Sequence, residues 1–136
     1  MIKKIDHIGI AVKDVESAIV YFEERFGFDT DYQVKLRGFH AAFLPTRETP
    51  IELIQDLSPD GVIAKFIEKR GEGVHHIAFE VEDIQSALET FRSQGIRTLD
   101  EKPREGAHES LVAFLHPKDT YGILIELVEY RKPSDK

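Results

Sequence analysis

Large apolar residues alternate with small or polar ones along two separate stretches of the chain, residues 8–12 and residues 77–81. Alternation of this kind is typical of a β-strand that buries one face. After each stretch, apolar residues recur at three- and four-residue intervals, which predicts an amphipathic helix beginning after Asp14 in the first case and after Asp83 in the second. A glycine follows each predicted helix and is expected to end it.

The two strand–helix segments are copies of one repeat. His7 aligns with His76 at an offset of 69 residues. The same offset aligns identical or similar residues at Ile8 and Ile77, Val12 and Val81, Asp14 and Asp83, Ser17 and Ser86, Ala18 and Ala87, and Phe22 and Phe91. Because self-similarity at a fixed offset indicates a duplicated structural unit, we expect two modules of the same α+β fold.

Further apolar runs, separated by turn residues, predict additional strands in each module. They cover residues 39–44, 51–57, 111–115 and 123–128. The stretch between the modules has apolar positions at helical spacing and predicts a short linking helix. We therefore expect a single domain, with module one at about residues 1–58, the linker at about residues 59–73 and module two at about residues 74–130.

The composition is that of an ordinary globular protein of 136 residues, with 41% hydrophobic residues. A net charge of −7 argues against nucleic acid as a partner, and no apolar run reaches the roughly 20 residues of a membrane helix, so we expect a cytoplasmic protein without a membrane partner. An anionic cofactor such as coenzyme A needs only a few cations, and Arg97, Arg104 and Lys118 are available. Cysteine is absent, so nitrogen and oxygen atoms would hold any metal.

Two histidines occupy the same place in the two modules. Because side chains alternate across a strand, His7 shares its face with Gly9 and Ala11, and His76 shares its face with Ala78. These neighbours are small, which leaves room for a ligand beside each imidazole.

Two glutamates interrupt apolar strands at corresponding places. Glu52 and Glu126 each stand in the sequence Ile-Glu-Leu, at an offset of 74 that a longer hairpin loop in the second module would explain. A buried carboxylate is costly unless it is paired or bound to a cation. We therefore expect each glutamate to have a partner.

Any one of these four side chains alone would more often be an ordinary exposed or strand-end residue. Their paired repetition instead favours a shared site that binds a hard or borderline divalent metal and leaves positions open for water or substrate. The predicted ligands are His7, Glu52, His76 and Glu126.

The remaining four histidines have weaker claims as ligands. His75 points away from His76 and is expected to cap or pack, and the alternation around His40 is that of an exposed strand residue. His108 and His116 lie in loop or turn segments, from which they could approach a substrate.

The motifs resemble those of the vicinal oxygen chelate superfamily and, within it, the methylmalonyl-CoA epimerases, over nearly the whole chain. The segments that carry the resemblance are DHIGIAV at residues 6–12, IAKFIEKRGEG at 63–73, HHIAFEV at 75–81, GAH at 106–108, AFLHPK at 113–118 and IEL at 125–127. Two departures stand out. Residues 35–42 lack the acidic residue of many epimerases, and Glu109 replaces the glycine that usually follows Gly-Ala-His.

The resemblance implies two tandem βαβββ modules that form a partly closed mixed β-barrel around a metal site, commonly in a homodimer. It places the ligands of a divalent ion such as Co²⁺, Mn²⁺ or Zn²⁺ at His7, Glu52, His76 and Glu126. It also implies an epimerase that acts on an acyl-CoA thioester and interconverts (R)- and (S)-methylmalonyl-CoA through an enolate.

Epimerisation by 1,1-proton transfer needs one base on each face of the enolate, and our hypothesis assigns Glu126 and Glu52 to these roles. One alternative is glyoxalase I, a lyase of the same fold with the same two-histidine, two-glutamate ligand set. The other is a small-molecule-binding protein of the same fold without catalysis, which predicts missing ligands.

Overall fold

The computed structural model describes residues 1–131, which form two compact units. The N-terminal unit consists of residues 7–75, and the C-terminal unit consists of residues 1–6 together with the chain from residue 76 onward. Two strands, β1 (Ile2–Ala11) and β5 (Gly73–Val81), contribute residues to both units.

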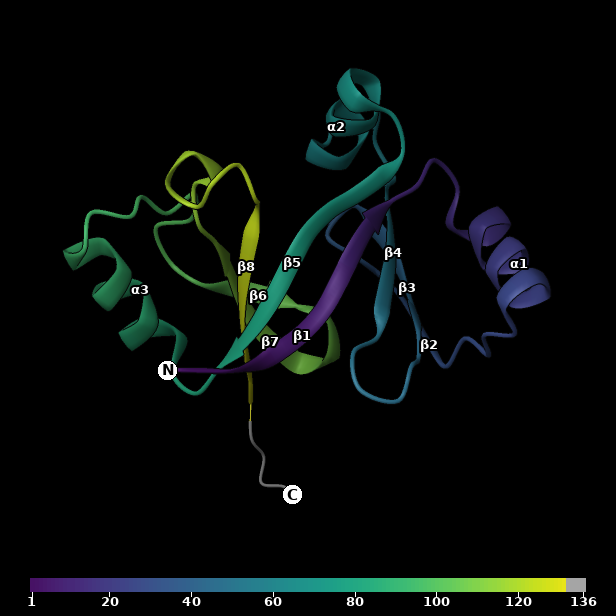
Figure 1. Ribbon diagram of the computed structural model, residues 1–136. Coiled ribbons are helices and arrows are strands. Elements are labelled where there is room, and N and C mark those ends of the chain that lie inside the picture. Colours follow the sequence, from purple (N-terminus) through teal and green to yellow (C-terminus); the bar gives the residue numbers. More distant parts are fainter. Residues whose placement is uncertain (132–136) are drawn as a thin grey trace. The chain divides into compact units, whose positions relative to one another are not determined.

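The N-terminal unit has strand order β2-β3-β4-β1, in which β4 is parallel to β1 and the other pairs are antiparallel (Figure 1). Its elements are α1 (Val15–Phe26), β2 (Tyr32–Leu36), β3 (Phe39–Leu44), β4 (Ile51–Asp56) and α2 (Val62–Arg70). The first four of these complete a βαβββ module with β1, and α2 follows as the linking helix.

The C-terminal unit repeats this arrangement with strand order β5-β8-β7-β6, in which β5 and β8 are parallel. Its elements are α3 (Ile84–Ser93), β6 (Arg104–Gly106), β7 (Ser110–Phe114) and β8 (Ile125–Tyr130), with 3-10 turns η1 (Ala107–Glu109) and η2 (Pro117–Asp119). The start of β1 is attached to this unit, since the Lys3 ammonium lies 3.4 Å from the Glu80 carboxylate.

The two long helices begin in the same way because the repeat conserves their caps. The Asp14 carboxylate accepts a hydrogen bond from the backbone N–H of Ser17, and the Asp83 carboxylate accepts one from the N–H of Ser86. Helix α1 ends at Gly27, whose φ of 77° is a left-handed conformation that glycine adopts without strain.

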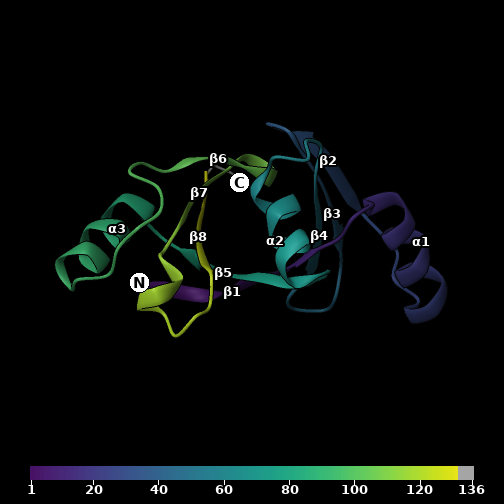
Figure 2. The ribbon, with the colours of Figure 1, turned by 90° about the horizontal axis from the view of Figure 1, so that it is seen from above.

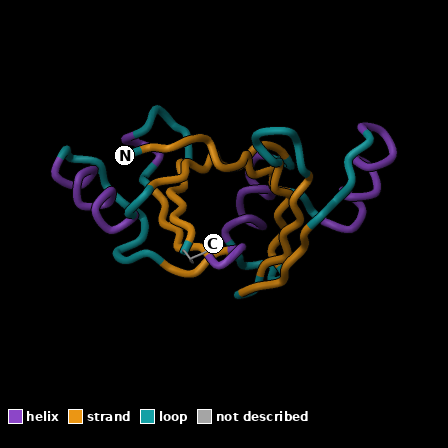
Figure 3. The backbone as a smooth tube through the Cα atoms, turned by 90° about the horizontal axis from the view of Figure 1, so that it is seen from below, coloured by secondary structure: helices purple, strands orange, loops and turns teal. Residues whose placement is uncertain are grey.

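Each helix covers one side of the strands of its own unit (Figures 2 and 3). The apolar stripe of α1 packs on β3 and β4 in one core cluster, and that of α3 packs on β7 and β8 in another. The first cluster is centred on the buried residues Val12, Val15, Ile19, Ala42, Leu44 and Leu53, and the second on Val81, Ile84, Ala87, Leu88, Ala113, Leu115 and Leu127. Neither α1 nor α3 covers the other side of these strands.

The α+β class and the two βαβββ modules predicted from the sequence are confirmed, as is the linking helix. Strands β2 and β6 were not located by their pattern, because one is a partly exposed edge strand and the other has only three residues. No helix within residues 1–131 is both long and apolar enough to span a lipid bilayer.

Candidate functional site

The N-terminal unit contains one buried histidine–glutamate pair. Glu52 of β4 lies opposite Gly9 of β1, and His7 stands two residues before Gly9 on the same face. The Nε2 atom of His7 is 3.3 Å from the Oε1 atom of Glu52, and each residue is only 6% exposed. The glutamate in its apolar strand therefore has the partner that its burial requires.

The C-terminal unit contains the equivalent pair. Glu126 of β8 lies opposite Ala78 of β5, and His76 stands two residues before Ala78. The Nε2 atom of His76 is 3.2 Å from the Oε1 atom of Glu126, with exposures of 3% and 8%. The strand register thus repeats between the units although the sequence offset differs, because the β7–β8 connection contains the additional turn η2.

A phenylalanine that the sequence pattern does not distinguish from other core residues completes each pair. Phe43 lies opposite Glu52 in the β3–β4 ladder, and its ring meets that of His7 edge-on at 5.7 Å between centroids. Phe114 lies opposite Glu126, and its ring meets that of His76 edge-on at 5.8 Å. We call each set of histidine, glutamate and phenylalanine a half-site. The rings fix the imidazole orientations and keep the surroundings apolar.

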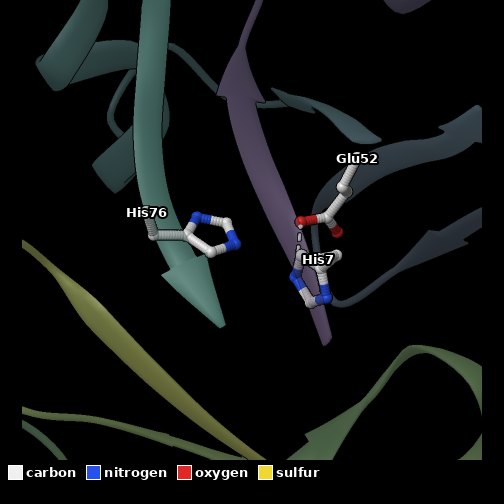
Figure 4. Close-up of side chains that lie close together, drawn as sticks. All are labelled: His7, Glu52 and His76. Atoms are coloured by element: carbon white, nitrogen blue, oxygen red, sulfur yellow. Dashed lines mark ion pairs between the residues drawn. The ribbon is translucent and has the colours of Figure 1, made fainter. Parts of the chain in front are cut away.

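The donor chemistry of the half-sites fits a divalent metal. His7, Glu52 and His76 each offer a buried nitrogen or carboxylate oxygen of the kind that binds such an ion. Figure 4 draws these three side chains, and its dashed line marks the His7–Glu52 pair. Gly9 and Ala78, the residues opposite the glutamates, are small, so the strands bring little bulk beside the ligand atoms.

The other histidines take structural roles or lie away from these pairs. The expectation that His40 is exposed was wrong: it is 4% exposed, and its Nε2 lies 2.9 Å from Gln33 Oε1, because the neighbouring strand and α1 cover it. His75 packs edge-on against Phe66 at 4.9 Å. His116 Nδ1 accepts a hydrogen bond from the backbone N–H of Lys118 at the start of η2.

The Gly-Ala-His-Glu loop has an uncommon backbone. His108 and Glu109 have φ values of 57° and 55°, which lie in the left-handed region. Glu109 therefore occupies a conformation that favours glycine, the residue that the resemblance implies at this position. The loop leads directly into β7, the strand that carries Phe114.

A second pairing joins residues that are distant in the sequence, and it could not be predicted from the sequence. The hydroxyl of Tyr130 at the end of β8 donates to the carboxylate of Asp6 in β1, with distances of 2.8 and 2.9 Å to the two oxygens. Asp6 is 7% exposed and directly precedes His7. Burial, followed by the nearby Asp6 carboxylate, raises the pKa of the Tyr130 hydroxyl above its usual value. The sequence shows an acidic residue, Asp6, within the first strand, but it does not indicate that Tyr130 is the partner of Asp6.

Comparison with known proteins identifies the superfamily to which this fold and these paired half-sites belong. The model of the glyoxalase/bleomycin resistance protein/dioxygenase superfamily matches residues 6–114, and the chain belongs to this superfamily. The members most informative for this chain are epimerases of acyl-CoA thioesters.

The mitochondrial methylmalonyl-CoA epimerase of Homo sapiens is 37% identical over 127 residues, which cover 91% of this chain and 72% of the human protein. The ethylmalonyl-CoA/methylmalonyl-CoA epimerase of Cereibacter sphaeroides is 38% identical over 131 residues, which cover 93% and 98% of the two chains. A solved structure of a Streptomyces coelicolor methylmalonyl-CoA epimerase variant in complex with 2-nitronate-propionyl-CoA has a TM-score of 0.91 at 34% identity, with 97% and 100% covered.

Proposed function

We propose that this protein is a metal-dependent epimerase that interconverts (R)- and (S)-methylmalonyl-CoA. The observation that carries the proposal is the pair of equivalent, buried histidine–glutamate half-sites in a chain whose relatives are methylmalonyl-CoA epimerases. The epimerase in the Streptomyces coelicolor complex holds a CoA derivative, which supports an acyl-CoA thioester as the substrate class.

The proposed metal ligands are His7, Glu52, His76 and Glu126, one histidine and one glutamate from each module. When bound, a divalent ion would act as a Lewis acid that stabilises the negative charge of an enolate. Two imidazole nitrogens and two carboxylate oxygens suit Co²⁺, Mn²⁺ or Zn²⁺.

The proton that moves is attached to the α-carbon, between a thioester carbonyl and a carboxylate. Removal from one face and return to the other face requires a base on each side. We assign these roles to Glu126 and Glu52, because the repeat supplies them in equivalent positions. In each half-site the histidine contacts the glutamate and the phenylalanine packs against the histidine, so the carboxylate has fixed neighbours while it accepts or returns the proton.

Two further features follow from the epimerase resemblance and belong to the same proposal. The chain is expected to work as a homodimer in the cytoplasm. Sedimentation equilibrium of the purified protein tests the first expectation, since a single species of twice the chain mass is the predicted result.

The competing activity is that of glyoxalase I, which the superfamily and the ligand types also allow. A paired assay separates the two: the metal-loaded protein is given methylmalonyl-CoA in one reaction and the methylglyoxal–glutathione adduct in the other. The proposal expects turnover of the first substrate only. Conversion of the glutathione adduct alone would replace the epimerase assignment with the lyase.

The assignment of the second base is tested with Glu52→Gln, which keeps an oxygen donor for the metal but cannot carry a proton. Epimerisation should fall by roughly 10²- to 10⁴-fold, the usual contribution of a general base, while the metal content stays near that of the wild type. The matched control is Glu48→Gln, an exposed loop glutamate of the same unit. A Glu52→Gln enzyme that epimerises at the wild-type rate would place the second base elsewhere.

A further inference from the structure

Helix α2 is fixed to the strand that carries Glu52. Asp56 stands four residues after Glu52 on β4 and therefore points to the same face. Its carboxylate accepts a hydrogen bond from the backbone N–H of Ala64, in the first turn of α2, at 2.8 Å. A side chain at Gly61, directly before the helix, would collide with this carboxylate, so glycine allows the close approach. The helix thus begins on the side of the sheet that holds the N-terminal half-site.

The surface of α2 is positively charged in a chain whose net charge is −7. Lys65 and Lys69 form one i,i+4 row on the helix, and Phe66 and Arg70 form the neighbouring row. The three cations are exposed, and Glu68 is the one carboxylate of the helix. Within residues 1–131, none of these cations forms an ion pair with a protein carboxylate. The helix therefore offers uncompensated positive charge to an anion in solution.

The guanidinium of Arg70 is positioned by an aromatic ring. Its central carbon lies 5.9 Å from the centroid of the Phe66 ring, within range of a cation–π contact. The Phe66 ring meets the His75 ring edge-on at 4.9 Å, so neighbours on α2 and β5 hold it. In the described part of the chain, no protein oxygen accepts a hydrogen bond from the Arg70 guanidinium. Its forked N–H donors match the oxygens of a phosphate.

Two of the cations that the sequence offered for coenzyme A are bound to protein carboxylates instead. Arg97 makes a two-pronged contact with Asp119 at 2.9 and 3.0 Å. The Nε of Arg104 donates to Asp100 Oδ1 at 2.8 Å. Each carboxylate offsets the positive charge that an incoming phosphate would meet. Both arginines are therefore poorer phosphate ligands than the cations of α2.

We propose that Lys65, Lys69 and Arg70 bind the phosphates of the coenzyme A portion of the substrate. This inference rests on the proposed function, which makes an acyl-CoA thioester the substrate. Arg70 precedes His76 by six residues, and a chain segment of that length spans at most about 22 Å. The pantetheine arm of coenzyme A separates its phosphates from the thioester in the same way. A thioester at the proposed metal site could therefore place its phosphates at the end of α2.

Three thioesters that differ only in their phosphates provide the test: methylmalonyl-CoA, its 3′-dephospho form and methylmalonyl-pantetheine, which has no phosphate. Calorimetric titration of the Co²⁺-loaded protein gives a dissociation constant for each. Arg70→Gln should weaken the binding of methylmalonyl-CoA by about tenfold, because it removes hydrogen bonds between charged groups. It should change the binding of the pantetheine thioester by less than about twofold, since that ligand has no partner for Arg70.

The remaining measurements identify the phosphate and the geometry. If Arg70 contacts the 3′-phosphate, Arg70→Gln should leave the dephospho thioester unaffected; if it contacts the diphosphate, the full loss should persist. Arg70→Lys should recover part of the affinity, because it restores the charge but not the fork. Binding of methylmalonyl-CoA to the wild type should also weaken as salt is added, more steeply than binding to Arg70→Gln.

The matched control is Arg47→Gln, an exposed arginine between β3 and β4 of the same unit, which should leave all three constants unchanged. Cations in a last helical turn also stabilise the helix dipole, and that role alone predicts a lower Tm for Arg70→Gln with unchanged binding. Unchanged binding, or equal weakening of the CoA and pantetheine thioesters, would overturn the proposal. A wild-type protein that binds none of the three thioesters would instead count against the epimerase function, so the two failures are distinguishable.

Discussion

The hydrogen bond from Tyr130 to Asp6 should contribute measurably to stability, and Tyr130→Phe isolates it. The substitution removes one hydroxyl and keeps the ring, so packing is preserved. The acceptor is a carboxylate that is 7% exposed, and the distances of 2.8 and 2.9 Å are those of a strong bond. Hydrogen bonds to charged groups contribute about 1.5–3 kcal/mol. Because Tyr130 is itself 37% exposed, the variant should lose an amount near the lower end of this range.

Urea denaturation followed by circular dichroism measures the loss directly. For a chain of this length, each kcal/mol corresponds to roughly 3–5 °C in Tm, so thermal melting gives an independent reading. The control is Tyr21→Phe: Tyr21 is 50% exposed, and its hydroxyl makes no hydrogen bond within residues 1–131. A Tyr130→Phe cost no larger than that of the control would refute the reasoning.

The contribution of the Tyr130–Asp6 hydrogen bond to stability should also depend on pH. The raised pKa of Tyr130 means that the folded state holds the phenol proton more tightly than the unfolded state, whose tyrosines ionise near pH ~10. The contribution is therefore complete below about pH 10 and is lost as the pH rises further. The stability difference between wild type and Tyr130→Phe should shrink in that alkaline range and stay constant near neutrality.

Three further outcomes follow from the structure. His76→Ala and Glu126→Ala should each sharply lower the metal content measured by plasma emission after dialysis, and full occupancy in both would contradict the ligand assignment. Arg97→Gln should raise the pKa of the Asp119 carboxyl from about 2 toward 3.8 in an NMR titration, and should remove a stabilisation that the wild type loses only as the pH falls toward 2; an unchanged titration would show that the side-chain hydrogen bond is not the cause. Leu127→Ala, at a fully buried position, should lower the free energy of unfolding by about 2–5 kcal/mol, and a loss below about 1 kcal/mol would mean that the site collapses around the deletion.

Much of the fold could be predicted because the same local signals occur in both copies of the repeat. The caps at Asp14 and Asp83 and the apolar stripes after them are local signals, and the structure follows them. Strand β6 has three residues and gives no periodicity to detect. His40 stands between the apolar Phe39 and Ala41, so alternation predicts that it faces outward, but its burial depends on a strand and a helix that pack over it, which alternation alone does not describe.

The candidate site could be predicted in part for the same reason. A glutamate within Ile-Glu-Leu is anomalous by itself, and its recurrence predicted a partner for each carboxylate. The structure supplies the partners as the pairs His7–Glu52 and His76–Glu126. The phenylalanines were ordinary core residues in the sequence, because only the strand register places them against the glutamates. Tyr130 and Asp6 are separated by 124 positions, so their contact depends on tertiary structure.

The central claim is tested most directly by incubating the metal-loaded wild-type protein with methylmalonyl-CoA of one configuration in D₂O. A base on each face of a planar enolate predicts that the other epimer forms and that deuterium appears at the α-carbon, as seen by proton NMR and mass spectrometry. Removal of the metal with a chelator should abolish both changes, and added Co²⁺ should restore them. A metal-loaded protein that neither interconverts the epimers nor introduces deuterium would contradict the account.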